Sequence, residues 1–143
     1  MHEGFSQLLA FMAPCLAITD PLERIDALGR AYIDFGLTHP ETYRLIFMED
    51  AKFSDEVLTM NQGKHGAIGG PGDQAFTLLR QTCAQLVESG YAKPIDPDLC
   101  AYLLWSTMHG LVSLQLACPS AAYDDPKALT EATIAMLHHG LLK

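Results

Sequence analysis

The sequence has few basic residues. Lys and Arg together number 9 against 17 Asp and Glu, which gives the 143-residue chain a formal net charge of −8. Proteins that bind nucleic acid neutralise phosphates with clustered cations, and the sequence contains no such cluster. Charged residues of both signs make up only 18% of the chain, which is little for a small monomer. We therefore expect no direct binding of nucleic acid, and we expect another subunit to cover part of the apolar surface.

The sequence also lacks metal-binding and catalytic motifs. Its four cysteines stand at positions 15, 83, 100 and 118, match no zinc-ligand spacing and include no Cys-x-x-Cys pair. Each has apolar helical neighbours, so the sequence predicts buried free thiols, as in a reducing cytoplasm. No Gly-x-Ser-x-Gly, His-x-x-x-His or Glu-x-x-His motif occurs. We predict a cytoplasmic protein that is not an enzyme and uses no metal and no cofactor.

Segments suited to a membrane or to a β-sheet are missing too. The apolar run 8–18 has no Lys or Arg before it and is interrupted by Pro14, unlike a signal peptide. The uncharged run 99–123 is broken by Pro119 and contains polar residues, so it is a poor membrane span. No segment alternates apolar and polar residues with a period of two. The sequence predicts no membrane association and no strands.

Sequence signals for the starts of helices are abundant instead. Three Asp-Pro pairs, beginning at Asp20, Asp96 and Asp125, each combine a preferred N-cap residue with a proline at the first helical position. Apolar residues recur at helical spacing between these signals. The sequence predicts an all-α fold of about six helices in a single domain over residues 1–143. The expected helices cover residues 2–17, 21–38, 41–49, 73–89, 97–117 and 126–141, and residues 50–72 are expected to form a loop, with a short helix at 55–60.

The helix at 97–117 organises the rest of the prediction. From Leu99 to Ala117 it contains no charged residue, and a helix that is apolar nearly all round is normally buried on most sides. Small residues recur along one face, where a partner helix can approach closely. Trp105, Met108 and His109 lie on the opposite side. We expect this helix to form the central wall of the domain.

The side chains expected to face the interior form the candidate ligand-binding site. An interior of aromatic and Met residues is either a packed core or a cavity for an apolar ligand, in which a few polar groups orient the molecule. His109 is correspondingly either a satisfied core histidine or a polar anchor for the ligand. The candidate residues are Tyr32, Phe35, Phe47, Phe76, Leu79, Cys83, Trp105, Met108 and His109.

A second stripe of small residues occurs on the last helix. Two stripes on two helices fit a four-helix interface between two copies of the chain, with two-fold symmetry. Packing of the last two helices against each other within one chain is the alternative. The candidate dimer-interface residues are Ser106, Gly110, Ser113, Ala117, Ala128, Ala132, Ala135 and His139.

With these features, the chain resembles the C-terminal regulatory half of TetR-like (tetracycline-repressor-like) transcriptional regulators. Residues 20–35, 39–47 and 105–111 carry the resemblance, the last as a Trp-Ser-Thr-Met-His-Gly-Leu segment similar to the Trp-His-Gly signature of one branch. The resemblance implies a homodimer, a buried pocket for a small-molecule effector in each subunit, and ligand-dependent spacing of two DNA-reading heads. The helix-turn-helix domain of the family has no counterpart in these 143 residues. Residues 1–18 match the helix that would link it to the regulatory core.

We therefore predict an effector-sensing and homodimerisation domain of a TetR-like regulator. The expected effector is a small, largely apolar molecule, and operator DNA is expected to be bound only through the N-terminal domain that the family has. A stand-alone helical protein that binds small molecules or a partner subunit, without a role on DNA, is the alternative.

Overall fold

The computed structural model of the chain describes residues 3–49, 71–118, 120 and 122–143. These residues form six α-helices and no strand, apart from one isolated antiparallel bridge between Ala92 and Leu142. The predicted all-α fold is therefore confirmed. The helices are α1 (Glu3–Met12), α2 (Pro21–Thr38), α3 (Pro40–Arg44), α5 (Pro71–Glu88), α6 (Pro97–Ala117) and α7 (Pro126–Leu141), with a 3-10 helix η1 (Ala13–Ala17) and a π-helical turn η2 (Leu45–Glu49).

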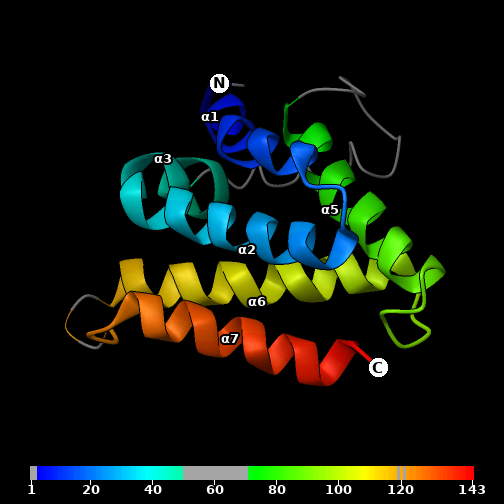
Figure 1. Cartoon of the computed structure of the whole chain (residues 1–143). Helices are drawn as coiled ribbons and strands as arrows, with labels where there is room; N and C mark the ends of the chain where they lie inside the picture. The colour runs from blue at the N-terminus through cyan, green and yellow to red at the C-terminus, as the bar shows by residue number, and fades with distance from the viewer. Residues whose placement is uncertain (1–2, 50–70, 119, 121) are drawn as a thin grey trace.

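The helices are arranged around α6 (Figure 1). α2 and α5 pack directly against α6, and α1 packs across α2 and α5 on the side away from α6. α7 runs beside α6 in the opposite direction and also packs against α2. The end of α7 is tied to the connector between α5 and α6 by backbone hydrogen bonds from Lys93 to Leu141 and from Lys143 to Tyr91. The helix predicted to be the central wall therefore lies in the centre.

The three Asp-Pro signals start helices as predicted. The side chains of Asp20, Asp96 and Asp125 accept hydrogen bonds from the backbone N–H three residues later, at 3.3, 3.1 and 3.0 Å. Each cap thereby satisfies one of the N–H groups that a helix leaves unpaired at its start. The C-terminal end of α5 is followed by Gly90, which adopts a φ of +80°. This left-handed conformation is typical of a glycine that terminates a helix.

Three predicted helices differ in detail from the observed ones. The first ends as an α-helix at Met12 and continues as η1, because Pro14 cannot donate the backbone hydrogen bond that an α-helix needs. The predicted helix 41–49 begins at Pro40 and changes from α3 to the wider turn η2 after Arg44. The helix predicted from residue 73 already begins at Pro71, so Asp73 lies in the first turn of α5. The expected helix at 55–60 lies outside the described residues.

The cysteine prediction is wrong at one position. Cys15, Cys83 and Cys100 are buried free thiols, whereas Cys118 is an exposed one. Cys118 is the C-cap residue of α6 and follows Ala117, which is exposed as well. The apolar context of a helix end does not by itself imply burial.

α6 is buried on one side only in the isolated chain. Cys100, Ala101, Leu104 and Met108 belong to the core, while Leu114 on the other side is 66% exposed. α6 is long and apolar enough by composition to cross a membrane, as the core helix of a globular protein also can be. Its packing against α2 and α5 shows that it serves as the core helix here.

Candidate functional site

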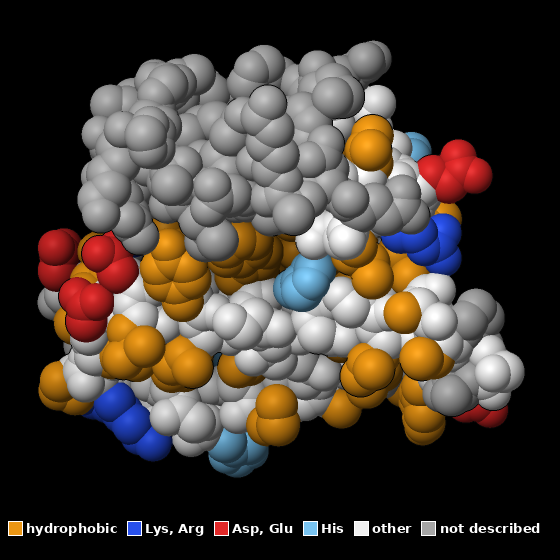
Figure 2. Space-filling view, turned by 180° about the vertical axis from the view of Figure 1, so that it is seen from behind, with side chains coloured by type: hydrophobic (Ala, Val, Ile, Leu, Met, Phe, Trp, Pro, Cys, Tyr) orange, Lys and Arg blue, Asp and Glu red, His pale blue; other side chains and the backbone are white. Residues whose placement is uncertain are grey.

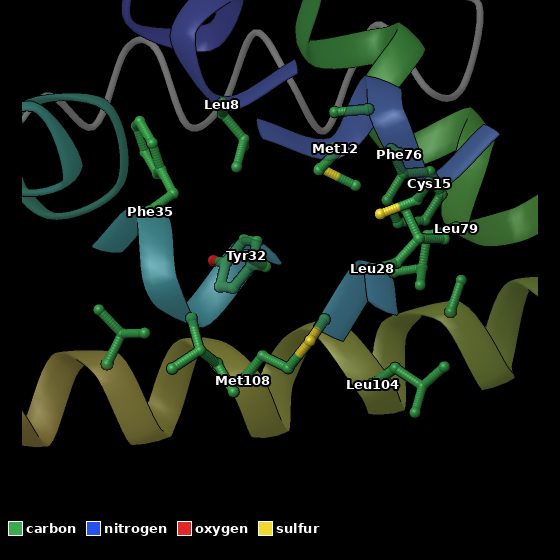
Figure 3. Packing of buried hydrophobic residues seen from close by; sticks show 14 of the residues in the cluster. Leu8, Met12, Cys15, Leu28, Tyr32, Phe35, Phe76, Leu79, Leu104 and Met108 are labelled. Atoms are coloured by element: carbon green, nitrogen blue, oxygen red, sulfur yellow. The ribbon is translucent and has the colours of Figure 1, made fainter. Parts of the chain in front are cut away.

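A cavity lies between α1, α2, α5 and α6. Its volume is about 40 Å³, and all its described lining side chains are apolar or aromatic. Figure 3 shows residues from α1, α2, α5 and α6 turned toward one another in this region. The lining residues are Phe5, Leu8, Met12, Leu28, Tyr32, Phe47, Gly72, Ala75, Phe76, Leu79, Trp105 and Met108.

Aromatic rings form much of the wall. The Trp105 ring contacts Phe47 and Phe76 with centroid distances of 6.1 and 6.0 Å, both edge to face. Phe47 also meets Phe5 at 5.5 Å and Tyr32 at 5.9 Å. Edge-to-face contacts of this kind stabilise aromatic clusters beyond the area that they bury. The rings come from α1, α2, η2, α5 and α6, so the cluster ties these elements together around the cavity.

A chain of hydrogen bonds leads from the cavity wall to the outer side of α6. Trp105 Nε1 donates to Tyr32 Oη at 3.0 Å, and Tyr32 Oη lies 2.7 Å from Tyr43 Oη. Tyr43 Oη lies 2.5 Å from His109 Nδ1, and His109 Nε2 lies 3.1 Å from Ser113 Oγ. The chain thus connects a residue that lines the cavity to one of the predicted interface residues.

The side chains that form these hydrogen bonds are neutral at neutral pH. Burial raises the pKa of both Tyr32 and Tyr43, because a phenolate loses its hydration in the interior. Burial lowers the pKa of His109, because the charged imidazolium is disfavoured there. Trp105 can only donate, so Tyr32 accepts from it. Of the two directions open to the bonds between Tyr32, Tyr43 and His109, the one that ends at His109 Nδ1 gives both hydroxyl protons an acceptor. His109 then carries its proton on Nε2 and donates to Ser113.

Most of the predicted ligand-binding residues lie at this cavity. Tyr32, Phe47, Phe76, Leu79, Trp105 and Met108 line it. Three predicted residues lie outside its lining. Phe35 is fully buried and packs against Phe11 and His39. Cys83 is buried beside Cys100, and the hydrogen bond to that thiol and desolvation raise its pKa. His109 takes part in the hydrogen-bond chain instead.

The prediction missed the contribution of α1. Phe5, Leu8 and Met12 are buried and line the cavity. Their spacing of three and four residues identifies them as one face of a helix, but the resemblance had assigned residues 1–18 a linking role. Ala75 and Gly72, at the start of α5, also line the cavity, and small residues give no sequence signal for such a position.

The predicted interface residues are on the surface of the isolated chain. Gly110 and Ser113 are half-buried, and an added Cβ at Gly110 would find no atom within 4 Å. The other predicted residues, Ser106, Ala117, Ala128, Ala132, Ala135 and His139, are exposed. Their part in a dimer stays a prediction.

The sequence predicts no metal site. Within the part of the chain that the structure describes, no group of three or more His, Cys, Asp and Glu residues is placed to hold a metal ion.

Comparison with known proteins agrees with this architecture. Residues 25–137 match the family model described as the tetracyclin repressor-like C-terminal domain. A solved structure described as that of a protein with unknown function from Rhodococcus sp. RHA1 has a similar fold, with a TM-score of 0.78 at 20% identity, over 99% of this chain and 70% of that one. None of the curated proteins compared with the sequence matches it. Because the family model covers most of the chain, the chain belongs to the family of tetracycline-repressor-like C-terminal domains.

Proposed function

We propose that this chain is the effector-sensing and homodimerisation domain of a cytoplasmic transcriptional regulator. The effector is a small, uncharged and largely apolar molecule that binds in the cavity between α1, α2, α5 and α6, and the domain binds it without chemical conversion. The observation that carries the proposal is the apolar and aromatic lining of this cavity, at the centre of a domain whose family consists of regulators. Apolar walls of this kind are typical of small-molecule sites.

The polarity of the wall selects a neutral effector. The polar atoms of Tyr32 and Trp105 are paired with each other at 3.0 Å, and no charged side chain occurs among the described lining residues. A carboxylate or an ammonium group would therefore lose its hydration without gaining a partner, which is strongly unfavourable. Aromatic faces and edges remain as the main contacts for the effector.

The size of the cavity requires side chains to move when the effector binds. At about 40 Å³ it is much smaller than the engineered cavity of roughly 150 Å³ that accepts benzene. Met12 and Met108 line it and are the side chains that can rearrange most readily, since methionine is unbranched and flexible. Met108 belongs to α6, so binding would act directly on the helix that carries half of the predicted interface residues.

The surface of α6 and α7 supports the proposed homodimer. Leu99, Leu103, Leu114 and Met136 are between 43% and 66% exposed on these helices. In Figure 2, groups of hydrophobic side chains are spread over the lower half of the view among white atoms, with His side chains on the same face, and the Lys, Arg, Asp and Glu side chains lie toward its margins. Exposed apolar side chains on a face with few charges are typical of a protein interface. An isologous contact of two such surfaces would form the four-helix interface.

The cavity assignment is tested by filling the cavity. Trp105 is the only tryptophan of the chain and lines the cavity, so its fluorescence reports a bound molecule directly. We expect toluene, used as the probe, to change this fluorescence in a saturable way in the wild-type chain. Ala75→Leu adds atoms to the cavity wall and should abolish the response.

Ala10→Leu on the exposed side of α1 is the matched control and should respond as the wild type does. Circular dichroism establishes that both variants retain their helical content. A folded Ala75→Leu variant that still binds toluene with wild-type affinity would contradict the proposed site, as would a wild-type chain without a saturable response.

A further inference from the structure

A second cavity adjoins the one described above. It lies between α2, α5, α6 and α7 and also has a volume of about 40 Å³. Leu79 of α5 and Met108 of α6 line both cavities. These two side chains therefore form the partition between them, and Figure 3 shows Met108 between α6 and the facing part of α2. Protein interiors are normally packed without voids, so two adjacent voids that share a wall are notable.

The partition can move without moving the backbone. Met108 is unbranched and can adopt several side-chain conformations. The residue that faces it on α2 is Gly29, which lines the second cavity, and an added Cβ there would lie 3.4 Å from Met108 Sδ. At this position α2 therefore presents no side chain to the Met108 sulfur atom. Glycine disfavours a helix relative to alanine, and at this position it leaves room beside the sulfur atom.

The two cavities differ in polarity at their far ends. The first is apolar throughout its described lining. The second is bordered by Asp26 and His138, whose Oδ1 and Nε2 atoms lie 2.6 Å apart. These side chains are 19% and 37% exposed, so this end of the second cavity borders the solvent. His138 is paired with Oδ1 of Asp26, so Oδ2 is the carboxylate oxygen that would accept a hydrogen bond from a ligand. The carboxylate also repels anions, so this end favours a ligand group that donates a hydrogen bond.

We propose that the two cavities are halves of one elongated site, which opens when Met108 turns aside, and that its ligand is an unbranched aliphatic molecule ending in a hydroxyl group. The aliphatic part of the ligand extends past Met108 into the aromatic cavity, and the ligand's hydroxyl group donates to Asp26 at the other end. This inference rests on the proposed function, because it assigns the effector class for the same site. It adds the second cavity, the movable partition and the preference against a carboxylate.

The test compares linear primary alcohols from hexanol to decanol with decanoate and with toluene. If the site is continuous, the dissociation constant of the alcohols falls about fourfold for each added methylene, as expected from burying one methylene group. Decanoate should bind more weakly than decanol. In a sample labelled at the methionine methyl groups, NMR should show the Met108 signal shifting with decanol.

Two variants examine the partition. Gly29→Ala places a methyl group beside Met108 Sδ and should weaken decanol binding several-fold more than toluene binding, because toluene stays in the first cavity, where Met12 can also move aside. Asp26→Asn keeps an acceptor but removes the charge, and should reduce the preference for decanol over decanoate. The melting temperature of each variant establishes that it is folded.

The outcomes separate this inference from the proposed function. If toluene binds but the alcohol affinities stop increasing at a short chain, or if Gly29→Ala leaves decanol binding unchanged, the elongated site is wrong and the proposed function stands. Tighter binding of decanoate than of decanol would overturn the assigned ligand class. Failure of toluene and of every alcohol to bind would overturn both proposals.

Discussion

Single residues decide the direction of the hydrogen-bond chain that starts at the cavity. Trp105 has a donor and no acceptor, so Tyr32 accepts from it at 3.0 Å. When Tyr32 donates to Tyr43 and Tyr43 donates to His109 Nδ1, both hydroxyl protons have an acceptor. A protonated His109 would donate from Nδ1 to Tyr43 Oη instead, so Tyr43 would donate to Tyr32 and the Tyr32 proton would lose its acceptor in this chain of bonds. The neutral state of one histidine is therefore a condition for the order of four other side chains.

This condition predicts a pH dependence of stability. Burial lowers the pKa of His109 in the folded chain, while the unfolded chain has the ordinary value of about 6.5. Between these two values the unfolded chain binds more protons, so the free energy of unfolding rises with pH. The stabilisation from neutral His109 is fully present above about pH 6.5 and is lost as the pH falls toward the folded pKa.

Urea unfolding of the wild type and of His109→Gln at several pH values measures this effect. Gln retains hydrogen-bonding groups and does not titrate, so the variant should lose less stability on acidification than the wild type does, although it is less stable at neutral pH. Parallel pH profiles for the two proteins would show that His109 does not titrate differently in the folded state.

Among the elements, α2 packs tightly against α6 at a glycine. An added Cβ at Gly36 would lie 2.5 Å from Val112 Cγ1 and 3.1 Å from the ring of Tyr43. Val112 and Tyr43 are fully buried, so neither can move away cheaply. The glycine thus determines how near α2 lies to α6, and with it the positions of Tyr32 and of the cavity wall.

Replacing this glycine should separate the helices. We expect Gly36→Ala to lower the free energy of unfolding by about 1–3 kcal/mol, the usual cost of overpacking a core. Gly29→Ala on the same helix is the control, since its Cβ would meet the Met108 sulfur atom at 3.4 Å, an ordinary contact, and helix propensity favours alanine. Thermal and urea unfolding compare the two. Equal stability of both variants would contradict the close approach.

At the scale of the whole molecule, the hydrogen-bond chain and the proposed interface meet on α6. Ser113 bonds to His109 and belongs to the predicted interface, and Trp105 on the same helix lines the cavity. An element that contacts both sites is what a coupling free energy between ligand binding and dimer geometry requires. In the proposed regulator, α6 is this element.

The interface prediction can be tested at Gly110. The space around it is open in the isolated chain, so Gly110→Arg should leave the subunit folded and should block a partner. We expect sedimentation at tens of micromolar to show a dimer for the wild type and a monomer for this variant.

Gln81→Arg, at an exposed position of α5, is the matched control and should remain dimeric. A wild-type monomer at these concentrations, or a Gly110→Arg variant that sediments as the wild-type dimer, would refute the assignment of the stripe.

Local chemistry explains why much of the fold could be predicted from the sequence. An N-cap such as Asp96 bonds to a backbone group three residues away, so the start of a helix depends on neighbours in the chain. The helical spacing of apolar residues likewise shows which face is buried. The all-α class, most helix boundaries and the family therefore followed from the sequence.

The tertiary structure decided which residues line the cavity. Helical spacing shows that Phe35 and Phe5 both face inward, but it does not show which neighbours each one meets. Phe35 packs against Phe11 and His39, while Phe5 lines the cavity. The hydrogen-bond chain joins residues of α2, α3 and α6 that are up to 73 positions apart. Such contacts follow from the packing of whole helices, because local sequence specifies a face and only the assembled fold specifies its partner.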